Sequence, residues 1–262
     1  MVLKFCANLS FMFQETASLL ERYQLAKEAG FSGIECASPY DFPLHQVVDI
    51  KENAKLNQVL INVPTGNLSE GELGFAALPE KTEGFIESFN RSVEYAKGLK
   101  CNLIHIMSGL VPNKTPLHNL TYENNLRSVV STLEKEGIIG VIEPINSITV
   151  PNYFLNDYEY ALEVIQKINS PNLKLQLDIF HLQHIKGNLT HNIKSLLPYV
   201  GHIQIAQVPN RNEPGTPGEI DYDYILHLIE KEGYAGWIGL EYKPLNSSKE
   251  GLIWLKKFGY SI

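Results

Sequence analysis

A single phrase recurs along this chain: a charged amphipathic stretch, a break at Gly or Pro, and then a short run of β-prone residues that ends in a polar side chain. Its copies are KEAGFSGIEC (27–36), AKGLKCNLIHI (96–106), EKEGIIGVIEP (134–144), SPNLKLQLD (170–178), LPYVGHIQIA (197–206) and EKEGYAGWIGLEY (230–242). Two more β-prone runs, LKFCAN (3–8) and QVLINVP (58–64), bring the predicted strands to eight. Apolar residues at helical spacing predict helices over 16–29, 43–56, 82–98, 122–136, 157–168, 189–197, 222–232 and 249–258.

Eight alternating strands and helices within 262 residues predict an α/β fold of the (β/α)8 TIM barrel type, as a single domain spanning 1–262. A hydrophobic content of 44% is enough to bury such a core. The alternative is an open doubly wound sheet, but no Gly-rich phosphate-binding turn follows any predicted strand. The longest predicted loops, 64–81, 107–120 and 207–220, each lead from a strand into its helix, and active sites of barrels lie at that end.

Composition restricts the partners of the chain. A formal charge of −7 and a pI near 5.6, without a concentrated Lys/Arg run, argue against nucleic acid and anionic membranes as partners. The apolar runs are too short for a membrane span, and no signal peptide is indicated. Cys6, Cys36 and Cys101 are widely spaced among apolar residues, which indicates buried thiols and a cytoplasmic protein. A homo-oligomer is compatible with the sequence, which does not define the oligomeric state.

The alternation of side chains along the strands selects a set of inward-facing polar residues. In LKLQLD the leucines must face the helices, which turns Asp178 toward the barrel axis. The same argument turns Glu143, Gln204 and Glu241 inward at the ends of strands five, seven and eight. Comparable interior positions, for which a purely structural role is the competing interpretation, are held by Glu35, Asn62, His105 and His202.

Three carboxylates converging inside a barrel need a cation or protonation to coexist, because an isolated buried charge costs many kcal/mol. Glu143, Asp178 and Glu241, with the amide oxygen of Gln204, form an oxygen-only set that suits Mg²⁺ or Mn²⁺ better than Zn²⁺. Singly, each acidic residue could instead cap a helix or accept hydrogen bonds from loop amides. Their shared parity at one end of the barrel favours a metal site.

Two further residues are candidates for substrate contacts. His181 follows Asp178 by about one helical turn in DIFHLQ, so we expect it to share the site. Arg211, in the loop after strand seven, either holds an anionic substrate or is a solvated loop cation. Lys243 is the competing cation, since it lies near the same rim.

These residues lie in blocks that resemble the hydroxypyruvate isomerase family, part of the xylose isomerase-like barrels, over nearly the whole chain. The blocks are ANLSFMF (7–13), GFSGIE (30–35), NVPTGN (62–67), IEPIN (142–146), VPNYFL (150–155), NLKLQLDIFHLQ (172–183), GHIQIAQVPNRNEPGTPGEIDYDYI (201–225) and GWIGLEYKP (236–244). The resemblance implies that Glu143 and Glu241 are the acid/base pair, that Asp178 and Gln204 complete a metal site with them, and that His181 touches substrate oxygens. Two segments depart from the family pattern and bear on the choice of substrate, HIMSGLVPNKTP (105–116) and GTPGE (215–219).

The resemblance implies an isomerase that interconverts hydroxypyruvate and tartronate semialdehyde through a metal-stabilised enediolate. In such an enzyme we expect Arg211, from its place in the loop after strand seven, to hold the substrate carboxylate. The same chemistry on 2-oxo-tetronate, or 3-epimerisation of a ketose, is the nearest alternative. An abasic-site endonuclease needs several zinc-binding His residues and a basic face, and this acidic chain offers neither. A non-catalytic binding barrel would have no reason to keep two costly buried carboxylates.

Overall fold

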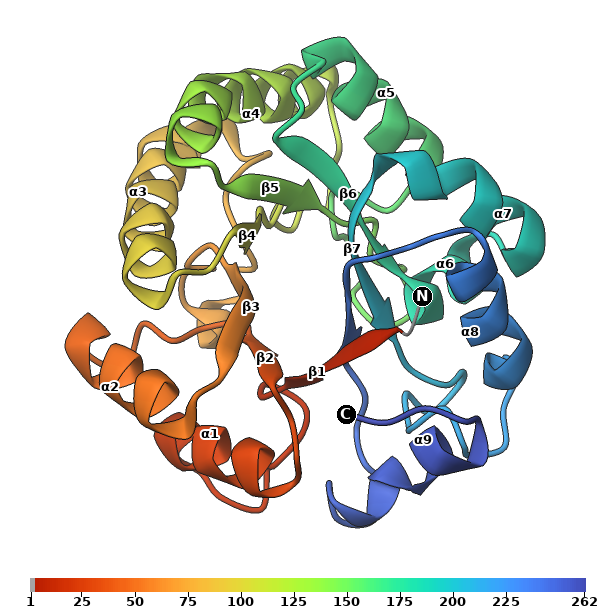
Figure 1. The fold of residues 1–262 in the computed structure, drawn as a ribbon. Helices are drawn as coiled ribbons and strands as arrows, with labels where there is room; N and C mark the ends of the chain where they lie inside the picture. The colour runs from red at the N-terminus through yellow and green to blue at the C-terminus, as the bar shows by residue number, and fades with distance from the viewer. Residues whose placement is uncertain (1–2) are drawn as a thin grey trace.

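The computed structural model describes residues 3–262, which form a closed barrel of eight parallel strands surrounded by helices (Figure 1). The strands are β1 (Lys4–Asn8), β2 (Gly33–Cys36), β3 (Asn57–Asn62), β4 (Leu103–His105), β5 (Ile139–Ile142), β6 (Leu173–Asp178), β7 (Val200–Ile205) and β8 (Trp237–Leu240). The helices are α1 (Leu19–Glu28), α2 (Leu44–Ala54), α3 (Thr82–Leu99), α4 (Pro116–Glu136), α5 (Tyr158–Ile168), α6 (Ile179–Ile185), α7 (Leu189–Leu196), α8 (Tyr222–Lys231) and α9 (Ile253–Lys257). Strand β8 closes the barrel against β1, so the predicted (β/α)8 TIM barrel is confirmed.

Two apolar clusters hold the barrel together, and they use mostly opposite faces of the same strands. Ile142, Leu175 and Ile203 belong to the large buried cluster that the strands share with the inner faces of the helices. A smaller buried cluster is formed by Cys6, Val59, Leu60, Leu103 and Val141, and all of these except Val59 have the parity opposite to the large-cluster residues of their own strands. Burying one such aliphatic side chain contributes about 1.5–3 kcal/mol. The strand parity predicted from the sequence is therefore confirmed.

Two helices differ most from the sequence prediction. Helix α4 begins at Pro116 rather than at 122, because Thr115 and His118 cap it reciprocally and proline suits the first turn. The loop after β4 is correspondingly shorter than the predicted 107–120. Helix α6 was absent from the predicted set. It begins directly after Asp178, whose side chain accepts a hydrogen bond from the backbone N–H of Phe180.

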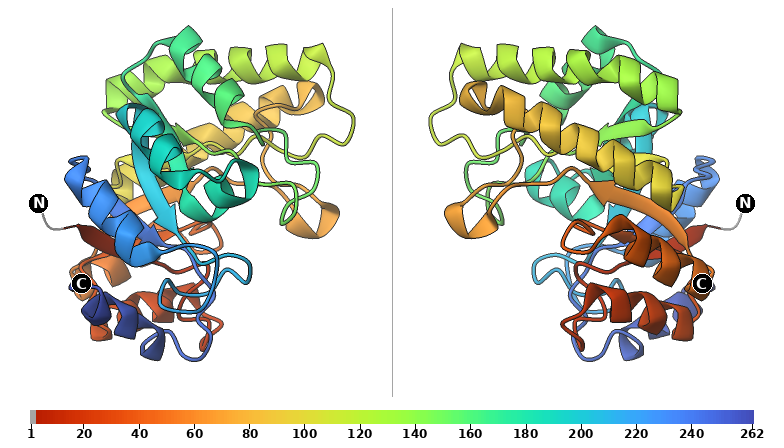
Figure 2. Two further views of the ribbon diagram at one scale, coloured as in Figure 1. Left: turned by 90° about the vertical axis from the view of Figure 1, so that its right-hand side faces the viewer. Right: turned by 90° about the vertical axis from the view of Figure 1, so that its left-hand side faces the viewer.

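The loops after β3, β4 and β5 pack against one another at the end of the barrel opposite β1's first residue (Figure 2). Isolated bridges pair Gly74 with Ser108 and Leu110 with Tyr153. The backbone N–H of Ser108 also donates to the Tyr153 hydroxyl at 3.0 Å. Gly74 has a φ of 94°, and a Cβ there would lie 2.4 Å from the Met107 side chain, so the close approach of the first two loops requires glycine.

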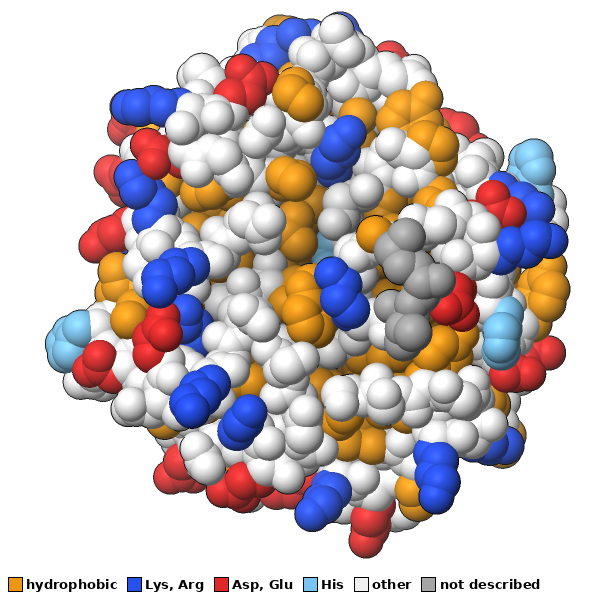
Figure 3. Space-filling model, in the orientation of Figure 1, with side chains coloured by type: hydrophobic (Ala, Val, Ile, Leu, Met, Phe, Trp, Pro, Cys, Tyr) orange, Lys and Arg blue, Asp and Glu red, His pale blue; other side chains and the backbone are white. Residues whose placement is uncertain are grey.

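The surface carries charges of both signs. On the face from which the N-terminus emerges, Lys/Arg and Asp/Glu side chains are interspersed around the margin (Figure 3). The three cysteines are buried and free, as predicted. Among the helices of residues 3–262, none is long and apolar enough to cross a membrane.

Candidate active site

The four inward-facing polar residues predicted from strand parity meet at the C-terminal end of the barrel. Asp178 ends β6 and is the register partner of Gln204 on β7. Glu143 follows β5 directly, and Glu241 follows β8 directly. Asp178, Glu143 and Gln204 are buried, while 16% of the Glu241 side chain is exposed. Glu241 is therefore the member of the set that solvent reaches most easily.

Burial and mutual repulsion disfavour ionisation of these carboxylates. Burial raises the pKa of Glu143 well above its ordinary value, and the charges of Glu241 and Asp178 raise it further. Burial, with the charges of Asp178 and Glu35, raises the pKa of Glu241 to about 8 although Arg211 opposes the shift. Burial also raises the pKa of Asp178. At neutral pH the cluster therefore retains protons unless another cation neutralises it.

Arg211 lies among the carboxylates rather than in solvent, since only 15% of its side chain is exposed. Its Nη2 donates to Glu241 Oε2 and lies 3.4 Å from Asp178 Oδ2. Its guanidinium carbon lies 4.5 Å from the ring centre of Phe11 and 4.9 Å from that of Phe180. The backbone φ of 58° is left-handed, a conformation that costs a non-glycine residue about 1–2 kcal/mol. A solvated loop cation is therefore excluded, and Arg211 is the counter-charge of two site carboxylates.

Asn146 fixes the protonation of the His181 ring. The Asn146 side-chain oxygen accepts from the backbone N–H groups of residues 148 and 149, so its amide nitrogen must face His181 Nδ1, at 2.6 Å. Because that nitrogen donates, Nδ1 accepts and the ring proton resides on Nε2. Nε2 lies 3.6 Å from Asp178 Oδ2 and 4.0 Å from Glu143 Oε1. Burial lowers the pKa of His181 well below its ordinary value, so a neutral ring directs an N–H donor into the cluster.

Gln204 presents its amide nitrogen to the cluster. Nε2 donates to Glu35 Oε1 at 2.8 Å and to Glu241 Oε1 at 3.2 Å. The amide oxygen instead accepts from Gln176 Nε2 at 2.7 Å. A metal-ligating role for Gln204 therefore requires its amide to turn over, with the loss of both hydrogen bonds to carboxylates.

The interior positions singled out from the sequence support the cluster. His202 Nε2 lies 2.6 Å from Glu35 Oε2, and both side chains are fully buried. His105 Nε2 lies 3.5 Å from Glu143 Oε2. Burial lowers the pKa of His105 to about 3, which leaves its ring neutral beside the carboxyl group.

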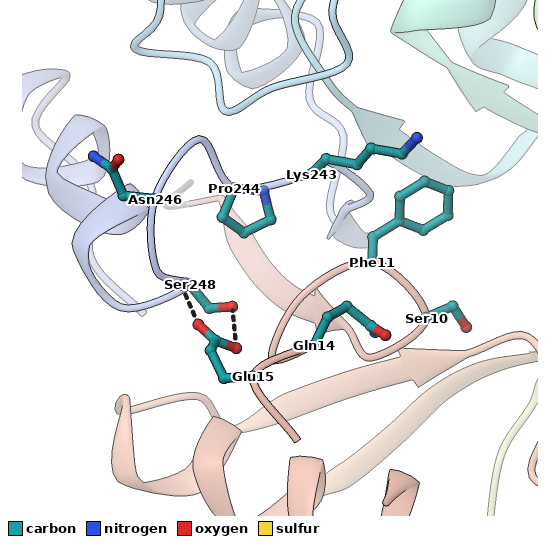
Figure 4. A pocket seen from close by; sticks show the side chains of 8 residues that line it. All are labelled: Ser10, Phe11, Gln14, Glu15, Lys243, Pro244, Asn246 and Ser248. Carbon is teal, nitrogen blue, oxygen red and sulfur yellow. Dashed lines mark hydrogen bonds between the residues drawn. The ribbon is translucent and has the colours of Figure 1, made fainter. Parts of the chain in front are cut away.

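A cavity of about 670 Å³ adjoins the site between the loops that follow β1 and β8 (Figure 4). Phe11 lies between the cavity and the carboxylate cluster, because it lines the cavity and its ring also contacts Arg211. Glu15 accepts hydrogen bonds from the backbone N–H and the hydroxyl of Ser248, which ties the two loops together. Lys243 is exposed and lines the same cavity, so its side chain lies at the rim that the sequence predicted.

Sequence reasoning missed the residues that orient the predicted groups. Asn146 orients His181, and Asn8 donates to site carboxylates, but the parity argument was applied to neither of them, although Asn8 has the interior parity of Cys6 on β1. Asn8 ends β1 and Asn146 lies four residues after the end of β5, and a polar amide at that end of a barrel strand is a usable signal. Phe11 and Phe180, which flank Arg211, carry no such signal.

Comparison with known proteins places the chain in a family. The family model described as xylose isomerase-like TIM barrel matches residues 23–258. A Danio rerio protein provisionally named hydroxypyruvate isomerase is 46% identical over 98% of this chain and 95% of its own length. Hydroxypyruvate isomerase of Escherichia coli (strain K12) is 37% identical over 98% of this chain and 100% of its own. The crystal structure of an AP endonuclease, family 2, from Brucella melitensis has a TM-score of 0.94 and 36% identity, covering 98% of this chain and 99% of that one. The chain belongs to the hydroxypyruvate isomerase family of xylose isomerase-like TIM barrels.

Proposed function

We propose that this protein isomerises hydroxypyruvate to tartronate semialdehyde, a reaction that moves hydrogen from C3 to C2 of a three-carbon acid. The observation that carries the proposal is the buried group of Glu143, Asp178 and Glu241, with the neutral His181 N–H donor directed into it. The names of relatives that are 46% and 37% identical support the choice of substrate.

The site residues fit a divalent cation as cofactor. One ligand atom each of Glu143, Asp178 and His181 can be chosen so that all lie within 4.8 Å of one another. Glu143 Oε1 is buried and has no hydrogen-bond partner in the described part of the chain. Glu143, Asp178 and Glu241 would hold Mg²⁺ or Mn²⁺ through oxygen, and Gln204 would join them after its amide turns over. Such an ion, when bound, supplies Lewis-acid stabilisation of negative charge on substrate oxygens.

The residues of the chain itself move the proton. One of Glu143 and Glu241, in its ionised form, removes a proton from C3, which leaves an enediolate, and the other, in its protonated form, delivers a proton to C2. The hydroxyl proton on the C3 oxygen passes to the C2 oxygen, and proton exchange with solvent then restores the starting state of the two carboxyl groups. Raised pKa values suit both carboxyl groups to proton exchange near neutral pH. His181 Nε2–H donates to a substrate oxygen, and Arg211 pairs with the substrate carboxylate through its planar guanidinium.

A substrate panel tests the proposal. The purified protein is assayed with hydroxypyruvate, 2-oxo-tetronate and a neutral ketose, each with and without added Mg²⁺ or Mn²⁺. We expect metal-dependent isomerisation, with kcat/KM for hydroxypyruvate at least about tenfold above that for the ketose, because a charge-assisted hydrogen bond to the carboxylate contributes about 1.5–3 kcal/mol. A preference for 2-oxo-tetronate would change the substrate and keep the chemistry. The absence of turnover on all three compounds would refute the proposal.

The name of the Brucella melitensis relative supports a second candidate, cleavage of DNA at abasic sites. Against it, the two metal-capable groups among residues 3–262 contain one His each, and the chain has a net charge of −7. A labelled duplex with one abasic site should remain intact after incubation with the protein and Mn²⁺ or Zn²⁺. Metal-dependent incision at that site would support the endonuclease instead.

Replacing Arg211 by Ala should raise KM for hydroxypyruvate at least about tenfold, and raise KM for a neutral ketose much less, because only the acid loses a charged partner. The matched control is Lys243→Ala, which removes the exposed cation of the neighbouring cavity and should change either KM by less than about threefold. Equal effects of Arg211→Ala on the two substrates would remove Arg211 as the carboxylate-binding residue. A selective effect of Lys243→Ala would transfer that role to Lys243.

A further inference from the structure

Glu35 occupies the barrel interior next to the proposed acid/base residue Glu241. It belongs to β2, is fully buried, and contacts side chains of two other strands, β1 and β7. Its Oε2 lies 2.6 Å from His202 Nε2 and 3.7 Å from the Cys6 thiol. Its Oε1 accepts a hydrogen bond at 2.8 Å from Asn8 Nδ2. All of these partners lie on the interior side of the strands. The Glu35 carboxylate therefore connects several interior side chains of the barrel.

Two side-chain amides connect Glu35 to Glu241. Asn8 Nδ2 donates to Glu35 Oε1 at 2.8 Å and to Glu241 Oε1 at 3.1 Å. Gln204 Nε2 donates to the same two oxygens, at 2.8 Å and 3.2 Å. An amide NH2 group carries two hydrogens in a fixed fork, so each amide can serve one oxygen of each carboxylate.

Both amides have their orientation fixed from the other side. The Asn8 oxygen accepts from the backbone N–H of Ser10 at 2.9 Å, and the Gln204 oxygen accepts from Gln176 at 2.7 Å. In this arrangement the nitrogen of each amide therefore faces the carboxylates. Glu35 is the acceptor that holds these nitrogens beside Glu241.

The sequence of β8 makes room for this arrangement. Gly239 is the register partner of Gln204, and a Cβ built on it would lie 2.3 Å from Glu35 Oε1. Any other residue at 239 would displace the Glu35 carboxylate, since real contacts are never that short. The space that the carboxylate occupies therefore depends on a glycine two positions before Glu241.

We propose that Glu35 is a positioning residue that holds Oε1 of Glu241 through Asn8, and also through Gln204 while its amide nitrogen faces the cluster, and leaves Oε2 as the oxygen that exchanges protons with the substrate. This inference rests on the proposed isomerase function. It explains why Glu241 Oε2 contacts Arg211 while Oε1 contacts only the two amides among the hydrogen bonds of the described residues. Glu35 itself contacts neither substrate nor the reacting atoms.

Three variants test the proposal. Glu35→Leu removes both acceptor oxygens and should lower kcat by about 10–100-fold with KM within about threefold, as is typical when an outer hydrogen-bonding partner is lost. Glu35→Gln keeps one acceptor oxygen for the two amides and should recover at least about half of the lost activity on a logarithmic scale. The matched control Cys6→Ala alters another buried neighbour of Glu35 that has no hydrogen bond to Glu241, and should keep kcat within about threefold.

Crystal structures of the variants give a readout that does not depend on turnover. In Glu35→Leu the Glu241 carboxylate should rotate away from its parental position or become disordered, whereas in Glu35→Gln and Cys6→Ala it should superimpose on the parent. Glu241 in its parental position in Glu35→Leu, or kcat unchanged in that variant, would overturn the positioning role. If the parent protein converts none of the panel substrates, the proposed function fails, and the crystal structures still decide whether Glu35 positions Glu241.

Discussion

Glu143→Gln and Glu241→Gln should each lower kcat by at least about 100-fold while KM changes by no more than about threefold. The substitution keeps the size of the side chain and one oxygen that can bind a metal, but it removes the ability to accept and release a proton. Both carboxyl groups lie in the buried cluster, with His181 beside Glu143 and Arg211 beside Glu241, and the proposed mechanism gives each of them one proton transfer. Loss of either should therefore stop one of the two proton transfers.

Turnover in deuterated water separates the two roles. A variant that exchanges the C3 hydrogen of hydroxypyruvate with solvent without forming aldehyde has kept its base and lost its acid. A variant that does neither has lost the base. His105→Asn is a useful control, because His105 lies beside Glu143 and its neutral ring has no proton-transfer role in the proposal. If either glutamine variant turns over within a few-fold of the parent, that glutamate is only a ligand and the two-carboxylate mechanism is wrong.

Stability of the metal-free protein should fall as the pH rises from about 6.5 to about 8, above the range in which the lowered pKa values of His105 and His181 act in the opposite direction. Burial first, and then neighbouring charges, raise the pKa of Glu241 from an ordinary value of 4.5 to about 8. Between these values the Glu241 carboxyl of the folded protein binds more protons than that of the unfolded chain, so at this group raising the pH favours unfolding. For one fully retained proton the slope approaches about 1.4 kcal/mol per pH unit. The raised pKa values of Glu143 and Asp178 act in the same direction.

A divalent cation should reverse this trend, because it binds the ionised carboxylates of the folded state and adds RT ln(1 + [L]/Kd) to stability. Calorimetry with a chelator, and with Mg²⁺ or Mn²⁺, at pH 5.5 and pH 8 should show a larger rise in Tm at the higher pH. Asp178→Asn should reduce that rise. Asparagine can still accept the N-cap hydrogen bond from Phe180, so the start of α6 is preserved. An unchanged Tm on addition of metal to the parent protein at pH 8 would show that the carboxylate cluster does not bind these ions.

The positions of the candidate site residues were predictable from the sequence because strand parity is a local property. Asp178 and Glu241 each follow a run in which apolar residues must face the helices, and the closed barrel then turns the next polar side chain inward. The start of α4 is also marked locally, by the capping residue Thr115 and by Pro116. The predicted boundary was too late because it was placed where the apolar helical spacing begins, which is further along the helix. The short helix α6 was missed for a similar reason, since its seven residues are too few to establish a helical period.

The amino-acid sequence by itself determined the number of strands, the face that each presents and the set of carboxylates that meet at one end of the barrel. Only the tertiary structure decided how those groups are paired, oriented and protonated. Arg211 pairs with Glu241, Gln204 directs nitrogen toward the cluster, and Asn146 places the His181 proton on Nε2. The physical reason is that periodicity reports the orientation of a side chain relative to its own strand, whereas hydrogen bonds and charge pairing depend on atoms from strands far apart in the chain. Those partners become neighbours only when the barrel closes.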